Sequence, residues 1–117
     1  MDNEIDLGFI ITKAPLESTL GSGFLNLAKQ GIDNGKKVEL FLISDGVWFA
    51  KKIENNSDTK KLRSLIKQGV NLIVSNDNLQ AAGIHNDELI KGITISDKPY
   101  SDLVNLVMEK WKRVMTI

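Results

Sequence analysis

The amino-acid sequence predicts a single α/β domain, a flavodoxin-like three-layer fold with a mostly parallel five-stranded sheet and helices on both faces. Apolar strand-like runs alternate with helical patterns along the whole chain, as expected when each strand is followed by a helix that crosses back over the sheet. The strand-like runs are almost continuously apolar, which is typical of strands buried on both faces. The length of 117 residues fits one domain, which we expect to cover residues 1–117.

The first strand is expected at residues 5–11 (IDLGFII), and the helix after it begins near Ser18. Asn34-Gly35 favours a left-handed end to that helix. The second strand is expected at residues 38–43. Apolar residues at helical spacing are expected on the buried face of the first helix: Leu20, Phe24, Leu27, Ala28 and Ile32.

The middle of the chain contains a short turn and a second regular helix. Residues 47–53 fit one amphipathic turn that carries Trp48 and Phe49. The helix after it is expected to be capped by Asp58 and to end at Gly69.

The third strand is expected at residues 70–74, and a short helix at residues 77–82 is stopped by Gly83. Residues 92–96 form the fourth strand, and Pro99 suits the first turn of the last helix. The apolar residues that repeat along this helix are Tyr100, Leu103, Val104, Val107 and Trp111. Residues 113–117 are expected to form a short closing strand.

Composition excludes several classes of function. The chain has no cysteine, which removes disulfides, thiolate metal ligands and thiol nucleophiles, and its one histidine leaves little material for a metal site. We therefore expect no metal and no cofactor. Fifteen basic residues balance fifteen acidic ones, so neither nucleic acid nor an anionic membrane is an expected partner. The apolar runs are too short for a membrane span and the amino-terminal residues do not read as a signal peptide, which favours a cytoplasmic protein.

Polar residues stand where three of the expected strands end. The carboxyl ends of parallel strands meet at one edge of the sheet, where ligands bind, and the helix starts found there offer backbone N–H groups to anions. The sequence therefore marks a shared pocket for an anion or a small polar ligand. The candidate residues are Thr12, Ser18, Ser44, Ser75, Asn76 and Asn78. Taken one at a time, these residues more commonly cap helices or turns.

Serine chemistry at Ser75 is disfavoured, because a nucleophilic hydroxyl needs an activating base. The only histidine, His85, lies beyond the glycine turn at Gly83, and no paired acid is evident from the spacing. We interpret Ser75 as a strand-end hydroxyl that is hydrogen-bonded to the next helical turn. No catalytic residue is assigned.

Trp48 and Phe49 are candidate interface residues. Two adjacent aromatic side chains cannot both point into one core from a short turn, so we expect one of them to be exposed. Exposed aromatic residues often mark an interface with another protein.

The order and spacing of several motifs carry a resemblance to a known family. These motifs are VELFLISDGV at residues 38–47 and LIVSNDNLQAAGIHNDELIKG at residues 72–92. With the flanking strands and helices, they cover nearly the full chain. The chain resembles the DsrE/DsrF-like family of small sulfur-relay proteins.

The resemblance implies a flavodoxin-like domain that assembles into homo-oligomers or hetero-oligomers, often trimers or hexamers. In catalytic relatives a cysteine near a subunit interface carries sulfur as a persulfide, and that position is Ser75 here. Some relatives have a second cysteine, whose position is Asn78 here. A serine hydroxyl does not replace a polarizable thiolate in sulfur transfer, so we do not expect sulfurtransferase activity.

The sequence therefore favours a non-catalytic subunit or a module that binds a small ligand or a partner. The partner would be further copies of this chain or a paralogous subunit that has the cysteine. One alternative is an enzyme, a hydrolase or a transferase, that uses a strand-end pocket around Ser75. The other is sulfur transfer with the thiol supplied by a partner subunit.

Overall fold

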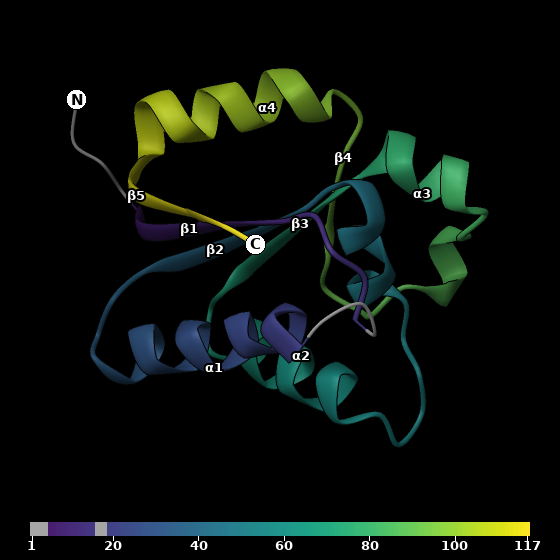
Figure 1. The fold of residues 1–117 in the computed structure, drawn as a ribbon, viewed down its shortest axis with the longest axis horizontal. Coiled ribbons are helices and arrows are strands. Elements are labelled where there is room, and N and C mark those ends of the chain that lie inside the picture. Colours follow the sequence, from purple (N-terminus) through teal and green to yellow (C-terminus); the bar gives the residue numbers. More distant parts are fainter. Residues whose placement is uncertain (1–4, 16–18) are drawn as a thin grey trace.

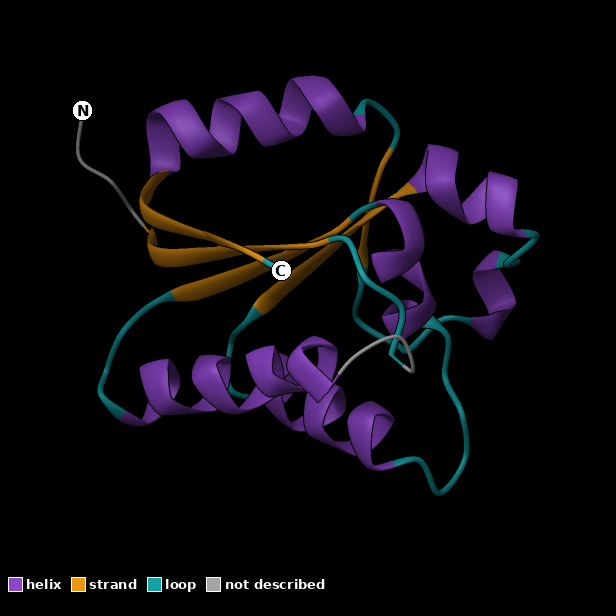
Figure 2. Cartoon of the chain, in the orientation of Figure 1, coloured by secondary structure: helices purple, strands orange, loops and turns teal. Residues whose placement is uncertain are grey.

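The structure is a computed structural model that describes residues 5–15 and 19–117, without the side chains of residues 19–22. Figure 1 shows the course of the chain, and Figure 2 shows its helices and strands. The strands are β1 (Ile5–Ile11), β2 (Val38–Leu42), β3 (Asn71–Ser75), β4 (Thr94–Ser96) and β5 (Trp111–Thr116). The α-helices are α1 (Thr19–Asp33), α2 (Ser57–Lys67), α3 (Asn76–Ala82) and α4 (Pro99–Asn105). Two 3-10 helices, η1 (Ser44–Ala50) and η2 (Asn86–Glu88), and a π-helical turn, η3 (Leu106–Lys110), complete the described elements.

The five strands form one sheet in the order β4-β3-β2-β1-β5, and all four pairings between neighbours are parallel. Helices α1 and α2 cover one face of the sheet and α4 covers the other (Figure 1). The predicted α/β class, the three layers and the five strands are confirmed. In the part of the chain that the structure describes, no helix is both long and apolar enough to cross a membrane.

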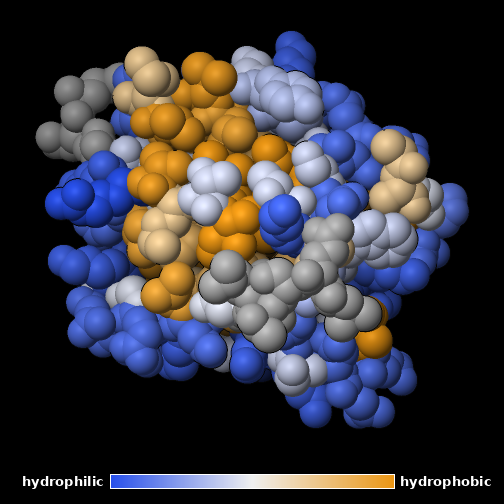
Figure 3. Space-filling model, viewed as in Figure 1, coloured by the Kyte–Doolittle hydropathy of each residue, from blue (hydrophilic) through white to orange (hydrophobic). Residues whose placement is uncertain are grey.

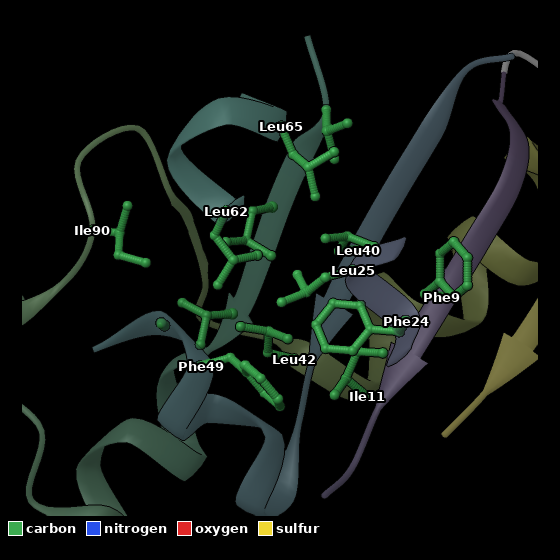
Figure 4. Packing of buried hydrophobic residues seen from close by; sticks show 14 of the residues in the cluster. Phe9, Ile11, Phe24, Leu25, Leu40, Leu42, Phe49, Leu62, Leu65 and Ile90 are labelled. Carbon is green, nitrogen blue, oxygen red and sulfur yellow. The ribbon is translucent and has the colours of Figure 1, made fainter. Parts of the chain in front are cut away.

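The larger core lies between the sheet and the layer of α1 and α2. Most of its side chains come from β1, β2, β3 and the two helices, others come from η1, α3 and the segment after α3, and Phe24 of α1 lies among them (Figure 4). The ring centre of Phe24 lies 6.4 Å from that of Phe9 and 4.9 Å from that of Phe49, edge-on to the latter. Each fully buried aromatic or aliphatic side chain contributes about 1.5–3 kcal/mol to folding, so this cluster is the main apolar source of stability.

The core on the α4 side is smaller, and its centre is Trp111. The indole ring lies against Gly8 of β1, where an added Cβ would stand 1.9 Å from the ring. The indole N–H donates to the Glu39 carboxylate at 2.9 Å, inside the protein. The Asn71 amide donates to the other Glu39 oxygen at 3.4 Å, and the Thr94 hydroxyl donates to Asn71 at 3.0 Å. A chain of hydrogen bonds therefore crosses the sheet from β5 to β4.

Two expectations on the α1 and α2 side are corrected. Leu27 is exposed, because the buried face of α1 includes Phe24, Leu25 and Ala28 and is therefore centred away from Leu27 at about 100° per residue. Helix α2 is capped by Asn56 instead of Asp58, and the Asn56 side chain accepts a hydrogen bond from the Thr59 N–H at 3.0 Å. The expected start at Ser18 lies outside the described residues.

The expected apolar stripe on the last helix is also corrected. Pro99 begins α4 as predicted, but the regular helix ends at Asn105 and a π-helical turn follows. Tyr100 is 70% exposed, Val104 is exposed as well, and Trp111 opens β5 instead of ending the helix. The π-turn changes the residue spacing, so a regular 3.6-residue pattern does not continue to Trp111.

Candidate functional site

Ser75 is the last residue of β3 and the N-cap of α3, and its side chain is fully buried. Its hydroxyl oxygen accepts a hydrogen bond from the Asn78 N–H at 3.3 Å. The helix that it caps ends at Gly83, which has the left-handed φ of +72°. The predicted bond between the strand-end hydroxyl and the next helical turn is confirmed. Burial and capping hold this oxygen inside the fold.

His85 takes part in a different local structure. It is exposed and is the N-cap residue before η2, and its backbone N–H donates to the Glu88 carboxylate at 2.9 Å. Lys51 lies 3.4 Å from the other oxygen of Glu88. The hydrogen bond from the His85 backbone, with the Lys51 ammonium, lowers the pKa of Glu88 below its ordinary value. These contacts stabilise the turn that leads from α3 to β4.

The remaining polar residues after β3 connect neighbouring strand ends. The Asn76 amide donates to the Asp97 carboxylate at 3.1 Å and accepts a hydrogen bond from Gln80 at 3.4 Å. The buried Ser96 hydroxyl, beside Ser75 in register, donates to the Asp102 carboxylate at 2.6 Å. These bonds fix the exits of β3 and β4 relative to α3 and α4.

The candidates after β1 and β2 have local roles as well. The Thr12 hydroxyl and backbone N–H both donate to the Ile117 carbonyl, at 2.7 and 2.8 Å. Ser44 is exposed with a left-handed φ of +51°, which turns the chain from β2 into η1. The turn needs glycine at position 46, because a Cβ there would lie 2.0 Å from the Ile11 carbonyl oxygen. Ser18 lies outside the described residues.

A pocket of about 320 Å³ lies beside this region, between the loop after β1, η1 and the start of α2. Trp48, which forms part of its wall, is 37% exposed, whereas its neighbour Phe49 is 2% exposed. The pair therefore divides between surface and core, as expected for two adjacent aromatics. The pocket is lined by Ala14, Pro15, Trp48, Phe49, Lys51, Ile53, Asn56, Asp58 and Thr59.

The wall of this pocket is mostly apolar, and its polar groups have partners. The Lys51 ammonium lies 5.8 Å from the centre of the Trp48 ring and pairs with Glu88. The Thr59 hydroxyl accepts the Ile53 N–H at 3.2 Å. The sequence indicated Trp48 and Phe49 but not Ile53 and Thr59. The only sign of these residues was that Ile53 is an apolar residue next to a polar loop.

A second exposed apolar surface lies over β5 and continues onto α4 (Figure 3). Val114 and Met115 are exposed on β5, and Val104 is exposed on α4. Met108, in the π-helical turn, is 75% exposed. Sequence reasoning did not single out this surface, because the last helix was expected to bury its apolar residues.

The described residues contain no group of three or more His, Cys, Asp or Glu side chains that could hold a metal ion. Of the polar candidates, Thr12, Ser75, Asn76 and Asn78 form hydrogen bonds that complete a cap or connect strand ends. Two apolar surfaces are exposed among the described residues: the pocket beside Trp48 and the surface over β5.

The chain is similar to a known family and to proteins of two archaea. Residues 6–116 match the DsrE/DsrF-like family. The chain is 30% identical over 104 residues to the uncharacterised protein MJ0989 of Methanocaldococcus jannaschii, covering 86% of this chain and 90% of that protein. It is 29% identical over 104 residues to the uncharacterised protein MK0008 of Methanopyrus kandleri, covering 86% of this chain and 84% of that protein.

Solved structures share the fold at lower identity. Protein MTH1491 of Methanobacterium thermoautotrophicum, of unknown function, has a TM-score of 0.77 at 17% identity and covers 97% of this chain and 100% of its own. The ychN protein of E. coli has a TM-score of 0.75 at 21% identity and covers 97% of this chain and 99% of its own. With a match that spans nearly every residue from β1 to β5, the chain belongs to the DsrE/DsrF-like family, as a member without cysteine.

Proposed function

We propose that this protein is a cytoplasmic, non-catalytic subunit that acts by binding other subunits and not by carrying sulfur. The observation that supports this most directly is the state of Ser75, which is fully buried and caps α3. A sulfur carrier needs an accessible thiolate, and the chain has no cysteine at this or any other position. The side chains of Thr12, Asn76 and Ser96 at the strand ends already have hydrogen-bond partners within the chain.

The partners would be further copies of this chain, in a trimer or a hexamer, or a paralogous subunit that has the cysteine. The exposed apolar residues on β5 and α4 favour such an assembly, because contiguous apolar surface on a small domain commonly marks an interface. Neither nucleic acid nor a membrane is a proposed partner, since basic and acidic residues balance.

The experiment combines native mass spectrometry of the purified protein with a persulfide-loading assay. We expect a mass that is a multiple of the single chain, or co-purification of a cysteine-bearing relative. We also expect no sulfane sulfur on the wild-type chain after treatment with a low-molecular-weight persulfide. A monomer that captures no such relative would contradict the proposal, and so would sulfane sulfur on the wild-type chain.

Two alternatives concern Ser75 and are tested separately. A Ser75-dependent hydrolase would lose ester hydrolysis in Ser75→Ala, and burial of the hydroxyl is the observation that disfavours this reaction. Sulfur transfer with a thiol from a partner subunit would appear as sulfane sulfur on the complex and not on the isolated chain. A Ser75→Cys variant tests whether the position accepts sulfur when it has a thiol.

Binding of a small apolar ligand is a second candidate function, favoured by the pocket beside Trp48. Its volume lies at the lower end of the range for ligand sites, about 300–1,000 Å³. Trp48 is the exposed one of the two tryptophans, so its fluorescence reports on the pocket. Titration with anilinonaphthalene sulfonate should change this emission, and Ile53→Asp should weaken binding. Leu27→Asp, which changes an exposed aliphatic residue of α1 that does not line the pocket, is the matched control.

A further inference from the structure

We propose that β5 pairs with the β5 strand of a second copy, antiparallel and about a twofold axis at Val114, to form a homodimer with one continuous sheet. The inference rests on the proposed function as an assembling subunit and adds the surface, the partner and the register. A twofold interface of this kind also allows a hexamer made of three such pairs.

The free edge of β5 is the first observation. β5 is the last strand of the sheet and pairs only with β1 among the described strands. The Ile117 N–H donates to the Ile10 carbonyl and the Ile117 carbonyl accepts from the Thr12 N–H, both at 2.8 Å. Peptide groups alternate between the two edges of a strand. The N–H and C=O groups of Lys112, Val114 and Thr116 therefore point away from β1.

These outward groups restrict the possible registers. In an antiparallel pair, residues whose peptide groups point to the partner lie opposite each other and exchange two hydrogen bonds. A twofold axis at Val114 places Val114 opposite its own copy, and Lys112 opposite Thr116 of the second copy. This register uses every outward peptide group of β5, whereas axes at neighbouring residues leave part of the ladder unpaired.

The charges of β5 disfavour two of the alternative registers. An axis at Arg113 or Lys112 would place two like charges directly opposite each other, which destabilises a strand pair. With the axis at Val114, Arg113 lies opposite Met115 of the second copy and Lys112 lies opposite Thr116. The two positive charges on the strand therefore disfavour axes at Lys112 and Arg113, whereas axes at Met115 and Thr116 are disfavoured by the peptide groups that they leave unpaired.

The apolar side chains agree with the pairing. Met115 lies beside Phe9 in register and so shares the α1 and α2 side of the sheet, where it would meet the aliphatic stem of Arg113 from the second copy. Val114 lies beside Gly8, on the side of Trp111, and would meet Val114 of the second copy. The part of the exposed apolar surface that lies on β5 would then contact the second copy (Figure 3).

Single cysteines test the register without interference, because the chain has no cysteine of its own. Across the proposed axis the two Cα atoms of residue 114 would be about 5.5 Å apart, within the disulfide range of about 4.4–6.8 Å. Val114→Cys should therefore form a disulfide-linked dimer under mild oxidation. In Lys112→Cys and Thr116→Cys, each residue would lie about 13 Å from its own copy, so neither control should cross-link alone. A mixture of these two variants should cross-link.

The outcomes separate this inference from the proposed function. Native assembly without a Val114→Cys cross-link would overturn the β5 pairing and leave the proposed assembly intact. A wild-type chain that is monomeric but captures a cysteine-bearing relative would overturn the β5 pairing alone, and one that is monomeric and captures no such relative would overturn both. Cross-linking of the control variants to the same extent as Val114→Cys would also overturn the register.

Val114→Pro provides a second test that keeps the fold. The Val114 N–H points away from β1, so proline there removes no hydrogen bond within the sheet, and proline is tolerated on edge strands. We expect a chain with unchanged circular dichroism that no longer dimerises. Retention of the native dimer in this folded variant would contradict the proposed pairing.

Discussion

The two sides of the sheet are stabilised in different ways. On the α1 and α2 side, the packing around Phe24 is apolar and aromatic. On the α4 side, Trp111 lies over Gly8 and donates to the buried Glu39, which also accepts from Asn71. The first side depends on filled volume, whereas the second depends on the position of one ring and its hydrogen bonds. Mutations that remove buried volume should therefore lower stability most on the α1 and α2 side, and mutations that remove a hydrogen-bond partner should lower it most on the α4 side.

The difference follows from the helices. Helix α1 is twice as long as α4, with 15 residues against 7, and buries Phe24, Leu25 and Ala28. Helix α4 leaves Tyr100 and Val104 exposed. The Trp111 ring of β5 therefore covers part of β1 that the short helix does not fill. Among the described residues, every buried side-chain nitrogen and oxygen has a hydrogen-bond partner, so the polar contacts on this side are complete.

The largest expected effect is on the apolar side. Phe24→Ala removes a fully buried ring between Phe9 and Phe49 and should lower the free energy of unfolding by about 3–5 kcal/mol. Leu27→Ala, in the same helix but exposed, should change it by less than about 0.5 kcal/mol. Denaturant titration of both variants measures the difference. Equal losses would contradict the assignment of the buried face of α1.

Gly8→Ala should destabilise the core on the α4 side of the sheet by displacing the Trp111 ring, because the added Cβ would stand 1.9 Å from this ring. Overpacking of this kind costs about 1–3 kcal/mol. Near-ultraviolet circular dichroism should also lose the signal of an ordered indole. Gly23→Ala is the control, because a Cβ there meets nothing within 4 Å and helical alanine is favoured over glycine. A Gly8→Ala variant with the wild-type indole signal would show that the ring does not need this space.

Glu39→Leu tests the hydrogen bonds apart from the volume. It leaves the buried Trp111 N–H without its acceptor at 2.9 Å, which should cost about 1–3 kcal/mol. Glu39→Gln keeps an acceptor oxygen and should recover part of this loss. We expect the melting temperature to be highest for the wild type, lower for Glu39→Gln and lowest for Glu39→Leu, and thermal unfolding of the three proteins measures this order. A Leu variant as stable as the Gln variant would indicate that the hydrogen bond contributes little.

The smallest expected effect is at the start of β1. Asp6 accepts the Lys37 N–H at 2.8 Å and lies 3.3 Å from the Lys112 ammonium. The hydrogen bond from the Lys37 N–H is the largest cause that lowers the pKa of Asp6, and the Lys112 ammonium lowers this pKa further. Because the pKa of Asp6 is lower in the folded state, the ionised carboxylate stabilises the fold at pH values above its unfolded-state pKa of about 3.9. This stabilisation is lost as the pH falls through the folded-state pKa.

Asp6→Asn retains the acceptor oxygen and removes the charge. It should lower the melting temperature slightly at neutral pH, and the difference from wild type should disappear under acid conditions. Melting curves at several pH values test this sign. A difference that grows as the pH falls would contradict the assigned pKa direction.

Most of the fold could be predicted from the sequence because its signals are local. Runs of apolar residues marked the strands, and Gly83 and Pro99 marked a helix end and a helix start. The errors arose where tertiary contacts decide. Trp111 fitted the helical spacing but opens β5, because the π-helical turn ends that spacing. Asn56 replaced Asp58 as the cap, since both residue types suit the position and the path of the loop selects one.

The candidate sites were less predictable. Capping by Ser75 was predicted, because a hydroxyl at a strand end before a helix has a local partner. The pocket beside Trp48 combines Pro15, Ile53 and Thr59 from separate segments, and no spacing in the sequence brings them together. The bond between Glu39 and Trp111 joins residues 72 positions apart. Contacts between residues this far apart depend on the order of the strands in the sheet, and no local pattern in the sequence indicates that order.

The position of β1 between β2 and β5 has a consequence for synthesis on the ribosome. Its hydrogen bonds reach residues near position 117, and the bond from Thr12 to Ile117 spans 105 positions. At about 5–20 residues per second, one edge of β1 remains unpaired for roughly 5–20 seconds after it emerges. During this interval the nascent chain exposes an apolar strand edge, the kind of surface that chaperones protect from aggregation. Addition of the last strand is therefore the step that ends the aggregation risk of the first.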